Sequence, residues 1–362
     1  MVLRRIGTMT AVLVMSTVLL AGCGLFGPEE ETRTSIDPPP GTESGGVEID
    51  AGDIGSIDAG TGNPDASAVD GEEALGTVNQ TVYLLDANGY VVPVTLPLPV
   101  SEGPAKQVLA YMVKGGPVEE LLPQGFTAVL PEGTTILGAN IVDGTATVDF
   151  SPQFANYEPE QEEKILQAVT KALTQFSTID NVAIWINGTP LTEMPVNKLP
   201  ITSLNRSTAV NLELADGAVP GRTTAVTVYF QGQLDQERTY YVPVTRLIPE
   251  TDDVARAVVE QLVKGPKEGS PLYSSLLSTT KVLGVENKDG TIVVNLSEDV
   301  LKYNNGKEAN PEAMQSLVLS LTENTGADKV QVMVEGKPLA AAGSLDFSKP
   351  VVRPLEINSF AF

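Results

Sequence analysis

The sequence contains no histidine and only one cysteine, Cys23, among its 362 residues. The absence of histidine excludes Ser-His-Asp and Cys-His catalysis, histidine-ligated zinc and histidine-based pH switching. A single cysteine excludes an intrachain disulfide and a cysteine cluster that binds a metal. We expect no catalytic residue, no metal site and no cofactor, a prediction that also depends on the candidate motifs and the family resemblance considered below.

Basic residues are also scarce, because 23 Lys and Arg stand against 46 Asp and Glu, which gives a formal charge of −23. This charge disfavours direct binding to DNA, RNA and anionic lipid headgroups, since all of them carry phosphate. We predict no nucleic-acid partner, and a basic protein partner stays open. The length is typical of two or three domains.

Residues 1–22 are predicted to be a lipoprotein signal peptide. Arg4 and Arg5 precede an apolar run, Met9–Leu20, that is too short for a comfortable membrane span. The run ends in Leu20–Cys23, which resembles the bacterial lipobox, where cleavage precedes a cysteine that receives a diacylglycerol. Two acyl chains give stable anchoring. We expect Cys23 to be lipidated and to hold the chain on the extracytoplasmic face of the cell membrane; an uncleaved anchor helix or an ordinary signal peptide are the alternatives.

Residues 23–76 are predicted to be the lipidated cysteine and a disordered acidic tether. From Pro28 to Gly76 the chain consists mainly of Pro, Gly, Ser, Thr and acidic residues, and Arg33 is its one base. Such a composition cannot bury enough apolar area to offset the entropy of ordering. About fifty residues of this kind span about 40 Å. An acidic docking tail for a basic partner remains the alternative.

The remaining sequence contains an internal repeat, in which four blocks recur in the same order at an offset of about 146–150 residues. The segment TVYLLDANGYVVPV at Thr81 returns as TVYFQGQLDQERTYYVPV at Thr227. VKGGP returns as VKGP, VDGTATVDFS as KDGTIVVNLS, and VAIWINGTPL as VQVMVEGKPL. After each copy, MPVNKLPITSLN is echoed by SKPVVRPLEIN. We predict a tandem duplication with domains at 77–205 and 206–362, the second with a C-terminal extension.

The periodicity inside each copy predicts the order β-β-α-β-β-α-β, with helices packed on a mixed sheet in an α+β fold. Apolar residues at helical spacing follow Pro104 and recur in a second, amphipathic helix, where the expected buried stripe is Ile165, Leu166, Val169, Leu173 and Phe176. Turns between strands are predicted at Asn88-Gly89, Asp143-Gly144 and Asn187-Gly188, and in the second copy at Asp289-Gly290.

The stretch YMVKGGP, Tyr111–Pro117, resembles a phosphate-binding loop. A phosphate loop places its glycines before a helix, whereas here the helical spacing comes first. A lysine in the last turn and a glycine just after it suit the C-terminal end of a helix. We predict Lys114 and Gly115 as helix caps, and Lys264 and Gly265 as their counterparts.

Other candidate sites have structural interpretations that we prefer. Ser278–Lys281 matches S-x-x-K but runs into a predicted strand, without the partner motifs of penicillin-binding enzymes. Paired acids at Glu162-Glu163 and Asp252-Asp253 lie in first turns of helices, where they favour the dipole. Asp143 and Asp289 are better explained by turns than by a metal. Trp185 lies in an apolar strand, and core or semi-buried packing explains it better than a sugar platform.

A lipobox, an acidic tether and two copies of VKGxP…DGTxxVxxS…VxxxxxGxPL resemble the GerMN-domain family of sporulation and germination lipoproteins. The resemblance implies that the α-β-β-α-β part of each copy is similar to the ring-building motif of secretion-system and sporulation channel proteins. It further implies a location between the two membranes around the forespore, on the outer forespore membrane. Family members help to place or hold the channel complex that joins mother cell and forespore. The family brings no catalytic residues.

Three hypotheses follow. The first is a non-enzymatic lipoprotein that binds sporulation membrane-complex proteins and is anchored through Cys23; its copies either support a ring or filament or mimic a dimer that blocks polymerisation. The second is a solute- or peptidoglycan-binding lipoprotein with its ligand between the copies. The third is a wall hydrolase or transferase.

Overall fold

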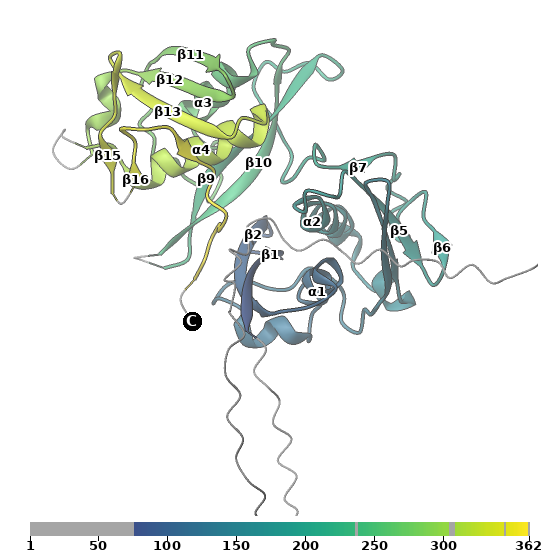
Figure 1. The fold of residues 1–362 in the computed structure, drawn as a ribbon. Helices are drawn as coiled ribbons and strands as arrows, with labels where there is room; N and C mark the ends of the chain where they lie inside the picture. Colours follow the sequence, from purple (N-terminus) through teal and green to yellow (C-terminus); the bar gives the residue numbers. More distant parts are fainter. Residues whose placement is uncertain (1–75, 236–237, 304–307, 344, 361–362) are drawn as a thin grey trace, which may run out of the picture. The chain divides into compact units, whose positions relative to one another are not determined.

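Two copies of one order of elements follow each other along the chain in the computed structural model (Figure 1). The structure describes residues 76–235, 238–303, 308–343 and 345–360, and all of them belong to a single compact unit. The predicted signal peptide, the lipidation of Cys23 and the tether lie outside the described residues.

The first copy begins with an antiparallel hairpin of β1 (Thr77–Leu85) and β2 (Val91–Pro99). The turn depends on Asp86, whose Oδ1 accepts the Asn88 N–H at 2.9 Å and the Tyr90 N–H at 2.8 Å. Gly89 supplies the positive φ of 79°. Only the glycine of the predicted Asn88-Gly89 pair has a positive φ, because the Asp86 carboxylate replaces the bonds of a two-residue turn.

The rest of the first copy is a mixed sheet with two helices. β3 pairs antiparallel with β4, and β4 pairs parallel with β5. The elements are α1 (Pro104–Ala110), β3 (Ile136–Val142), β4 (Thr145–Phe150), α2 (Glu162–Thr174) and β5 (Asn181–Ile186), with the short strands β6 (Thr189–Pro190) and β7 (Leu204–Asn205) on β5 and the 3-10 turns η1 (Pro117–Leu121), η2 (Pro152–Ala155) and η3 (Pro159–Gln161).

The second copy repeats this order and pairing. Its hairpin is β9 (Thr223–Gln233) and β10 (Thr239–Pro249), and its mixed sheet has the order β11-β12-β13. The elements are α3 (Val254–Lys264), β11 (Val282–Lys288), β12 (Thr291–Leu296), η4 (Glu298–Leu301), α4 (Pro311–Thr325) and β13 (Lys329–Val334), with the short strands β8 (Glu213–Leu214), β14 (Lys337–Pro338), β15 (Ala341–Ala342), β16 (Leu345–Asp346) and β17 (Val351–Val352). The predicted α+β fold with two copies is confirmed.

The core lies where the predicted apolar stripes meet. All five residues of the predicted stripe, from Ile165 in α2 to Phe176 just after it, are buried. Alternate residues of β4 (Ala146, Val148 and Phe150) are buried, as are Ile292, Val294 and Leu296 at the matching positions of β12. Burying one such large side chain stabilises the fold by about 1.5–3 kcal/mol, so these stripes fix which face of each sheet the helices cover.

The Asp-Gly turns lie where the repeat placed them. Asp143 and Gly144 have φ values of 48° and 73° between β3 and β4, and Asp289 and Gly290 have 50° and 78° between β11 and β12. Positive φ at both positions matches the twist of the flanking strands. Both pairs therefore shape hairpins.

The prediction for Lys114 is wrong, because α1 ends at Ala110 and has no basic residue in its last turn. Beyond Tyr111 the backbone pairs with another segment: the Leu130 N–H donates to Met112 at 2.8 Å, and the Lys114 N–H donates to Leu130 at 3.0 Å. These bonds satisfy the backbone outside the helix. Gly115, with φ 69°, belongs to the turn that follows rather than to a helix cap.

In the second copy the equivalent helix, α3, extends as far as the predicted lysine. α3 ends at Lys264, and the Gly265 N–H donates to the carbonyls of Gln261 and Leu262. Gly265 has φ 80° and ψ −177°, which lies outside the left-handed helical region that we expected. This combination is open essentially to glycine alone.

Candidate functional site

The candidate site is the junction at which β2 of the first copy lies against β10 of the second. In β2, the backbone N–H and C=O groups of every second residue from Val91 to Thr95 face away from β1. In β10, every second residue likewise directs its backbone groups away from β9. Pro93 and Pro243 occupy such outward positions. Proline has no N–H, so it is tolerated on a strand edge. Two strand edges meet here without a continuous ladder.

Two asparagines bridge these edges. Asn211 donates from Nδ2 to the carbonyls of Val91 and Pro243, each at 2.8 Å, and accepts the Val91 N–H at 2.9 Å. Asn358 makes the same bonds with the copies exchanged: Nδ2 donates to Pro93 at 2.7 Å and Tyr241 at 2.8 Å, and Oδ1 accepts the Tyr241 N–H at 2.7 Å. Both asparagines have positive φ, at 51° and 56°, which asparagine tolerates better than most side chains.

The residue before each asparagine extends the pattern. Val210 exchanges bonds with Thr245, and Ile357 exchanges bonds with Thr95, each through a threonine N–H at 2.8–3.0 Å and a threonine hydroxyl at 3.0 Å. Val210-Asn211 and Ile357-Asn358 are therefore equivalent. Our alignment of SLN, ending at Asn205, with EIN was wrong; the useful signal was a β-branched residue followed by asparagine after each copy.

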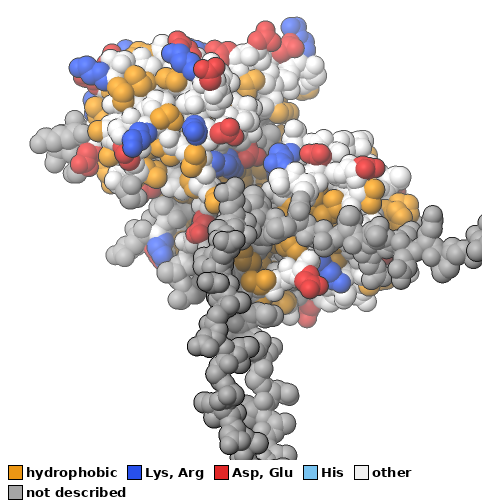
Figure 2. All heavy atoms as spheres, viewed as in Figure 1, with side chains coloured by type: hydrophobic (Ala, Val, Ile, Leu, Met, Phe, Trp, Pro, Cys, Tyr) orange, Lys and Arg blue, Asp and Glu red, His pale blue; other side chains and the backbone are white. Residues whose placement is uncertain are grey.

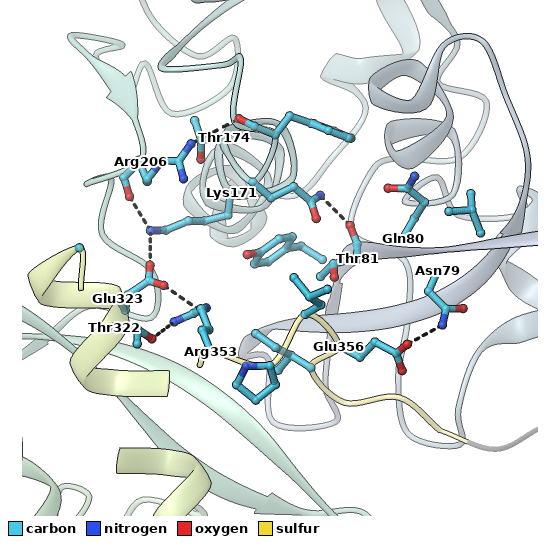
Figure 3. A pocket seen from close by; sticks show the side chains of 18 residues that line it. Asn79, Gln80, Thr81, Lys171, Thr174, Arg206, Thr322, Glu323, Arg353 and Glu356 are labelled. Atoms are coloured by element: carbon cyan, nitrogen blue, oxygen red, sulfur yellow. Dashed lines mark hydrogen bonds and ion pairs between the residues drawn. The ribbon is translucent and has the colours of Figure 1, made fainter. Parts of the chain in front are cut away.

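A cavity of about 570 Å³ is lined by β1, α2, α4 and the C-terminal segment (Figure 3). Glu323 is central on one wall: its carboxylate lies 2.9 Å from Arg353, 3.5 Å from Lys171 and within 3.4 Å of the Tyr229 hydroxyl. Lys171, only 8% exposed, also donates to the Arg206 carbonyl at 2.8 Å. The network joins α2 of the first copy to α4 and the C-terminal segment of the second.

The electrostatics keep Glu323 ionised. Burial acts to raise the pKa of its carboxyl, but Arg353 and Lys171 outweigh burial and hold that pKa below its usual value. Desolvation lowers the pKa of Lys171, and burial raises the pKa of the Tyr229 hydroxyl. These groups hold one another in place, which is a structural role.

Arg206 differs from these cations. Its guanidinium donates to the Phe176 carbonyl at 3.3 Å, and the side chain is exposed at the cavity. Within the residues that the structure describes, no ion pair links Arg206 to a carboxylate. The cavity thus holds one guanidinium with free donors.

Sequence reasoning missed the role of Glu162. Its buried carboxylate accepts the N–H groups of Val196, Asn197 and Leu199 at 2.8–3.1 Å and the Tyr157 hydroxyl at 2.8 Å. Burial acts to raise its pKa, but the hydrogen bonds, led by that of Asn197, outweigh burial and lower the pKa. Glu162 fastens the loop after β6, beyond the dipole role that we expected.

The remaining candidates are not brought together. Ser278 lies in a turn before β11 rather than at a helix start, Asp253 caps α3 by accepting the Arg256 N–H at 3.1 Å, and Trp185 is half-buried in β5.

No cluster of three or more potential metal ligands occurs among the described residues. None of the helices in the described ranges is long and apolar enough to cross a membrane. On the face shown in Figure 2, basic side chains are scattered among acidic and apolar ones.

A family model named Germane, described as "Sporulation and spore germination", matches residues 81–192 and 227–340. The chain belongs to this family. It is 39% identical over 359 residues to "Spore germination protein GerM" of Bacillus subtilis (strain 168), with 97% of each chain covered. The solved tandem GerMN domains of that sporulation protein match with a TM-score of 0.74 and 42% identity, covering 79% of this chain and 100% of theirs. The first GerMN domain alone shares 57% identity and has a TM-score of 0.35, covering 36% of this chain and 98% of that one.

The predicted GerMN resemblance is therefore confirmed. The two Germane matches fall on the two copies, each from the first strand of the hairpin to the short strand after the last long one. Membership assigns the chain to sporulation and germination proteins.

Proposed function

We propose that this protein is a non-enzymatic, extracytoplasmic lipoprotein that binds or positions the channel complex between mother cell and forespore. It would be anchored on the outer forespore membrane by a diacylglycerol on Cys23. Full-length similarity to a spore germination protein carries the proposal.

The junction supports a binding role. Lys171 and Arg353 are committed to Glu323, so these three charged groups hold the two copies together. Asn211 and Asn358 fasten β2 to β10 where the two hairpins meet, which suits a protein that presents a fixed surface.

The test is made in sporulating cells that carry a fluorescent tag inside residues 28–75, since the C-terminal segment bonds to the first copy. We expect the wild-type chain to surround the forespore and to co-purify, after crosslinking, with a membrane protein of the channel complex. Cys23→Ala should release the chain from the membrane. Recovery of no channel protein from a correctly located chain would contradict the proposal.

A second candidate, binding of a solute or of peptidoglycan fragments, is favoured by the cavity beside the junction. Calorimetry with purified muropeptides tests it. Heat of binding that is lost when Arg206 is replaced by Gln would support this candidate, and no heat would remove it.

A further inference from the structure

The second copy contains a carboxylate that is held by an arginine and a tyrosine. One oxygen of Glu323, Oε2, accepts from the Arg353 guanidinium at 2.9 Å and from the Tyr229 hydroxyl at 3.4 Å. Arg353 also donates to the Tyr229 hydroxyl at 2.9 Å and lies over the Tyr229 ring, 5.5 Å from its centre. The three side chains form one cluster in which the carboxylate is the common acceptor.

The first copy repeats the arginine and the tyrosine of this cluster. Arg206 directly follows β7, which pairs with β5, as Arg353 directly follows β17, which pairs with β13. Each arginine also lies five residues before the asparagine of the junction. Tyr83 stands at the position of Tyr229, because the TVY of β1 recurs as the TVY of β9. Both groups that hold the carboxylate are therefore present twice.

The carboxylate itself has no counterpart in the first copy. Gln175 stands at the position of Glu323 when the helices are aligned through the VAIWING and VQVMVEG segments that follow them. Its Nε2 donates to two backbone carbonyls of the first copy, each at 2.7 Å, and the amide has no charge to pair with Arg206. In the described part of the chain, no carboxylate pairs with Arg206 and the Tyr83 hydroxyl makes no hydrogen bond.

Both of these groups are donors that line the cavity. Arg206 is exposed and donates to the Phe176 carbonyl, so most of its five N–H groups stay free. Burial, together with the nearby Tyr229 and Glu323, raises the pKa of the Tyr83 hydroxyl well above its usual value, so this hydroxyl stays protonated. The Arg206 cation acts to lower the same pKa, which shows that its charge reaches Tyr83. A guanidinium and a protonated hydroxyl without acceptors favour an anionic ligand.

The rest of the cavity wall suits a small ligand with an apolar part (Figure 3). In a chain of net charge −23, three cations line the cavity against two carboxylates: Lys171, Arg206, Arg353, Glu323 and Glu356. Leu355, also on the wall, is 76% exposed, and an aliphatic group that covers it removes apolar surface from water. The volume of about 570 Å³ lies in the range of small-molecule sites.

We propose that Arg206 and the Tyr83 hydroxyl bind the carboxylate of a small aliphatic ligand, in the arrangement that the second copy makes with its own glutamate. The ligand supplies the acceptor that the first copy lacks, and its aliphatic part covers Leu355. Amino-acid derivatives and the stem peptides of peptidoglycan both carry this chemistry. This inference rests on the second candidate of the proposed function, a ligand in the cavity, and names the chemical class of that ligand.

The probe is N-acetyl-leucine, which combines one carboxylate with one aliphatic group, and N-acetyl-leucinamide is its uncharged control. Binding is measured by calorimetry on residues 24–362, which lack only the predicted signal peptide and Cys23. We expect the acid to bind with a Kd of about 0.1–1 mM and the amide at least about tenfold more weakly. The affinity for the acid should fall as salt rises. No saturable heat up to about 10 mM, or equal affinities for acid and amide, would overturn the site.

Two substitutions each remove one donor. Arg206→Gln should weaken binding about tenfold and reduce its salt dependence, because a charge-assisted bond is lost. Tyr83→Phe removes only the hydroxyl and should weaken binding about threefold to tenfold, with the salt dependence unchanged. The matched controls are Arg222→Gln, on an exposed cation of the second copy, and Tyr111→Phe, outside the cavity, and both should stay within about twofold. Similar losses in a variant and its control would overturn the assignment.

A third substitution builds the missing carboxylate into the chain. Gln175→Glu reproduces the arrangement of the second copy, so the new carboxylate should pair with Arg206 and weaken probe binding at least about tenfold. Gln175→Ala, the control, adds no charge and should keep binding within about threefold. Unchanged binding in a folded Gln175→Glu chain would overturn the proposal. If that chain does not fold, Arg206→Gln and Tyr83→Phe decide.

Muropeptides identify the source of the ligand. Displacement of the probe by muropeptides, with the same sensitivity to Tyr83→Phe, makes the ligand a wall fragment. Muropeptides that give no heat while N-acetyl-leucine binds would remove wall fragments and leave the site to a free amino-acid derivative. Muropeptide heat that survives both Arg206→Gln and Tyr83→Phe would overturn this site. Failure of the cellular test with probe binding intact would instead remove the channel-complex proposal and leave this site.

Discussion

The two copies share one order of elements but treat the junction between helix and hairpin in opposite ways. Ser320 and Asn324 give α4 a polar face that hydrogen-bonds to the edge of β9, whereas the buried, apolar Ala172 and Phe176 stand at the matching positions of α2 and make no such bonds. Glu323 adds a charge where the first copy has Gln175. A few side chains on one helix face thus decide whether the helix is hydrogen-bonded to the hairpin edge, as in the second copy, or mainly packed against it, as in the first.

The largest effect is expected from Glu323→Ala. It leaves the cations of Lys171 and Arg353 without their shared carboxylate, and removing one member of a buried pair costs about 3 kcal/mol. Gln175→Ala, at the matching position of the first copy, loses neutral hydrogen bonds worth about 1 kcal/mol. Urea unfolding of both variants measures the difference. Equal losses would show that Glu323 does not hold the junction.

The next effect separates the two glycines after the first helix of each copy. Gly265→Val should destabilise the chain by about 2–3 kcal/mol, because φ 80° with ψ −177° is open essentially to glycine. Gly115→Val, at φ 69°, should cost about 1–2 kcal/mol. Thermal unfolding checks the order, with Gly103→Val, outside the positive-φ positions, as the control. The reverse order would contradict the backbone argument.

The repeat and the periodicity predicted the elements, the Asp-Gly turns and the stripe of α2, because these depend on local spacing and on glycine chemistry. They failed at Lys114. The helix α1 ends at Ala110, and four residues later the Lys114 N–H donates to the distant Leu130 carbonyl instead of to a helical carbonyl. They also missed Glu162 and the pair Asn211 and Asn358, whose partners lie far away in the chain. Local patterns do not show which distant backbone groups need a partner.

The third prediction concerns pH and compares Glu162 with Asn310, which stands at the matching position and caps α4 through the Ala313 N–H. The folded pKa of Glu162 lies below its unfolded value, so its stabilisation is complete above the unfolded pKa and is lost as pH falls through the folded one. Glu162→Gln should cost about 2 kcal/mol at neutral pH and progressively less in acid.

Asn310→Ala should cost about 1 kcal/mol, and this loss should not change with pH because the asparagine cap is neutral. Urea unfolding at neutral pH and at a pH below about 4, the ordinary range of a glutamate, separates the two. A Glu162→Gln loss that stays constant with pH would refute the charged clamp.

The smallest effect is expected at Lys114, whose stretch resembled a phosphate-binding loop, and at its counterpart Lys264. Lys264 lies in the last turn of α3 and contacts Asp216 at 3.0 Å on the surface, so Lys264→Ala should lower stability slightly at low salt, and the loss should vanish as salt screens the charges. Lys114 lies outside α1, so Lys114→Ala should change stability even less, at any salt. Unfolding midpoints at low and high salt measure both. A loss at Lys114 that exceeds the loss at Lys264, or a loss of function in a Lys114→Ala chain that is still folded, would make Lys114 a functional residue. The bond from its N–H to Leu130 argues against that outcome, because it needs only the backbone and survives the substitution.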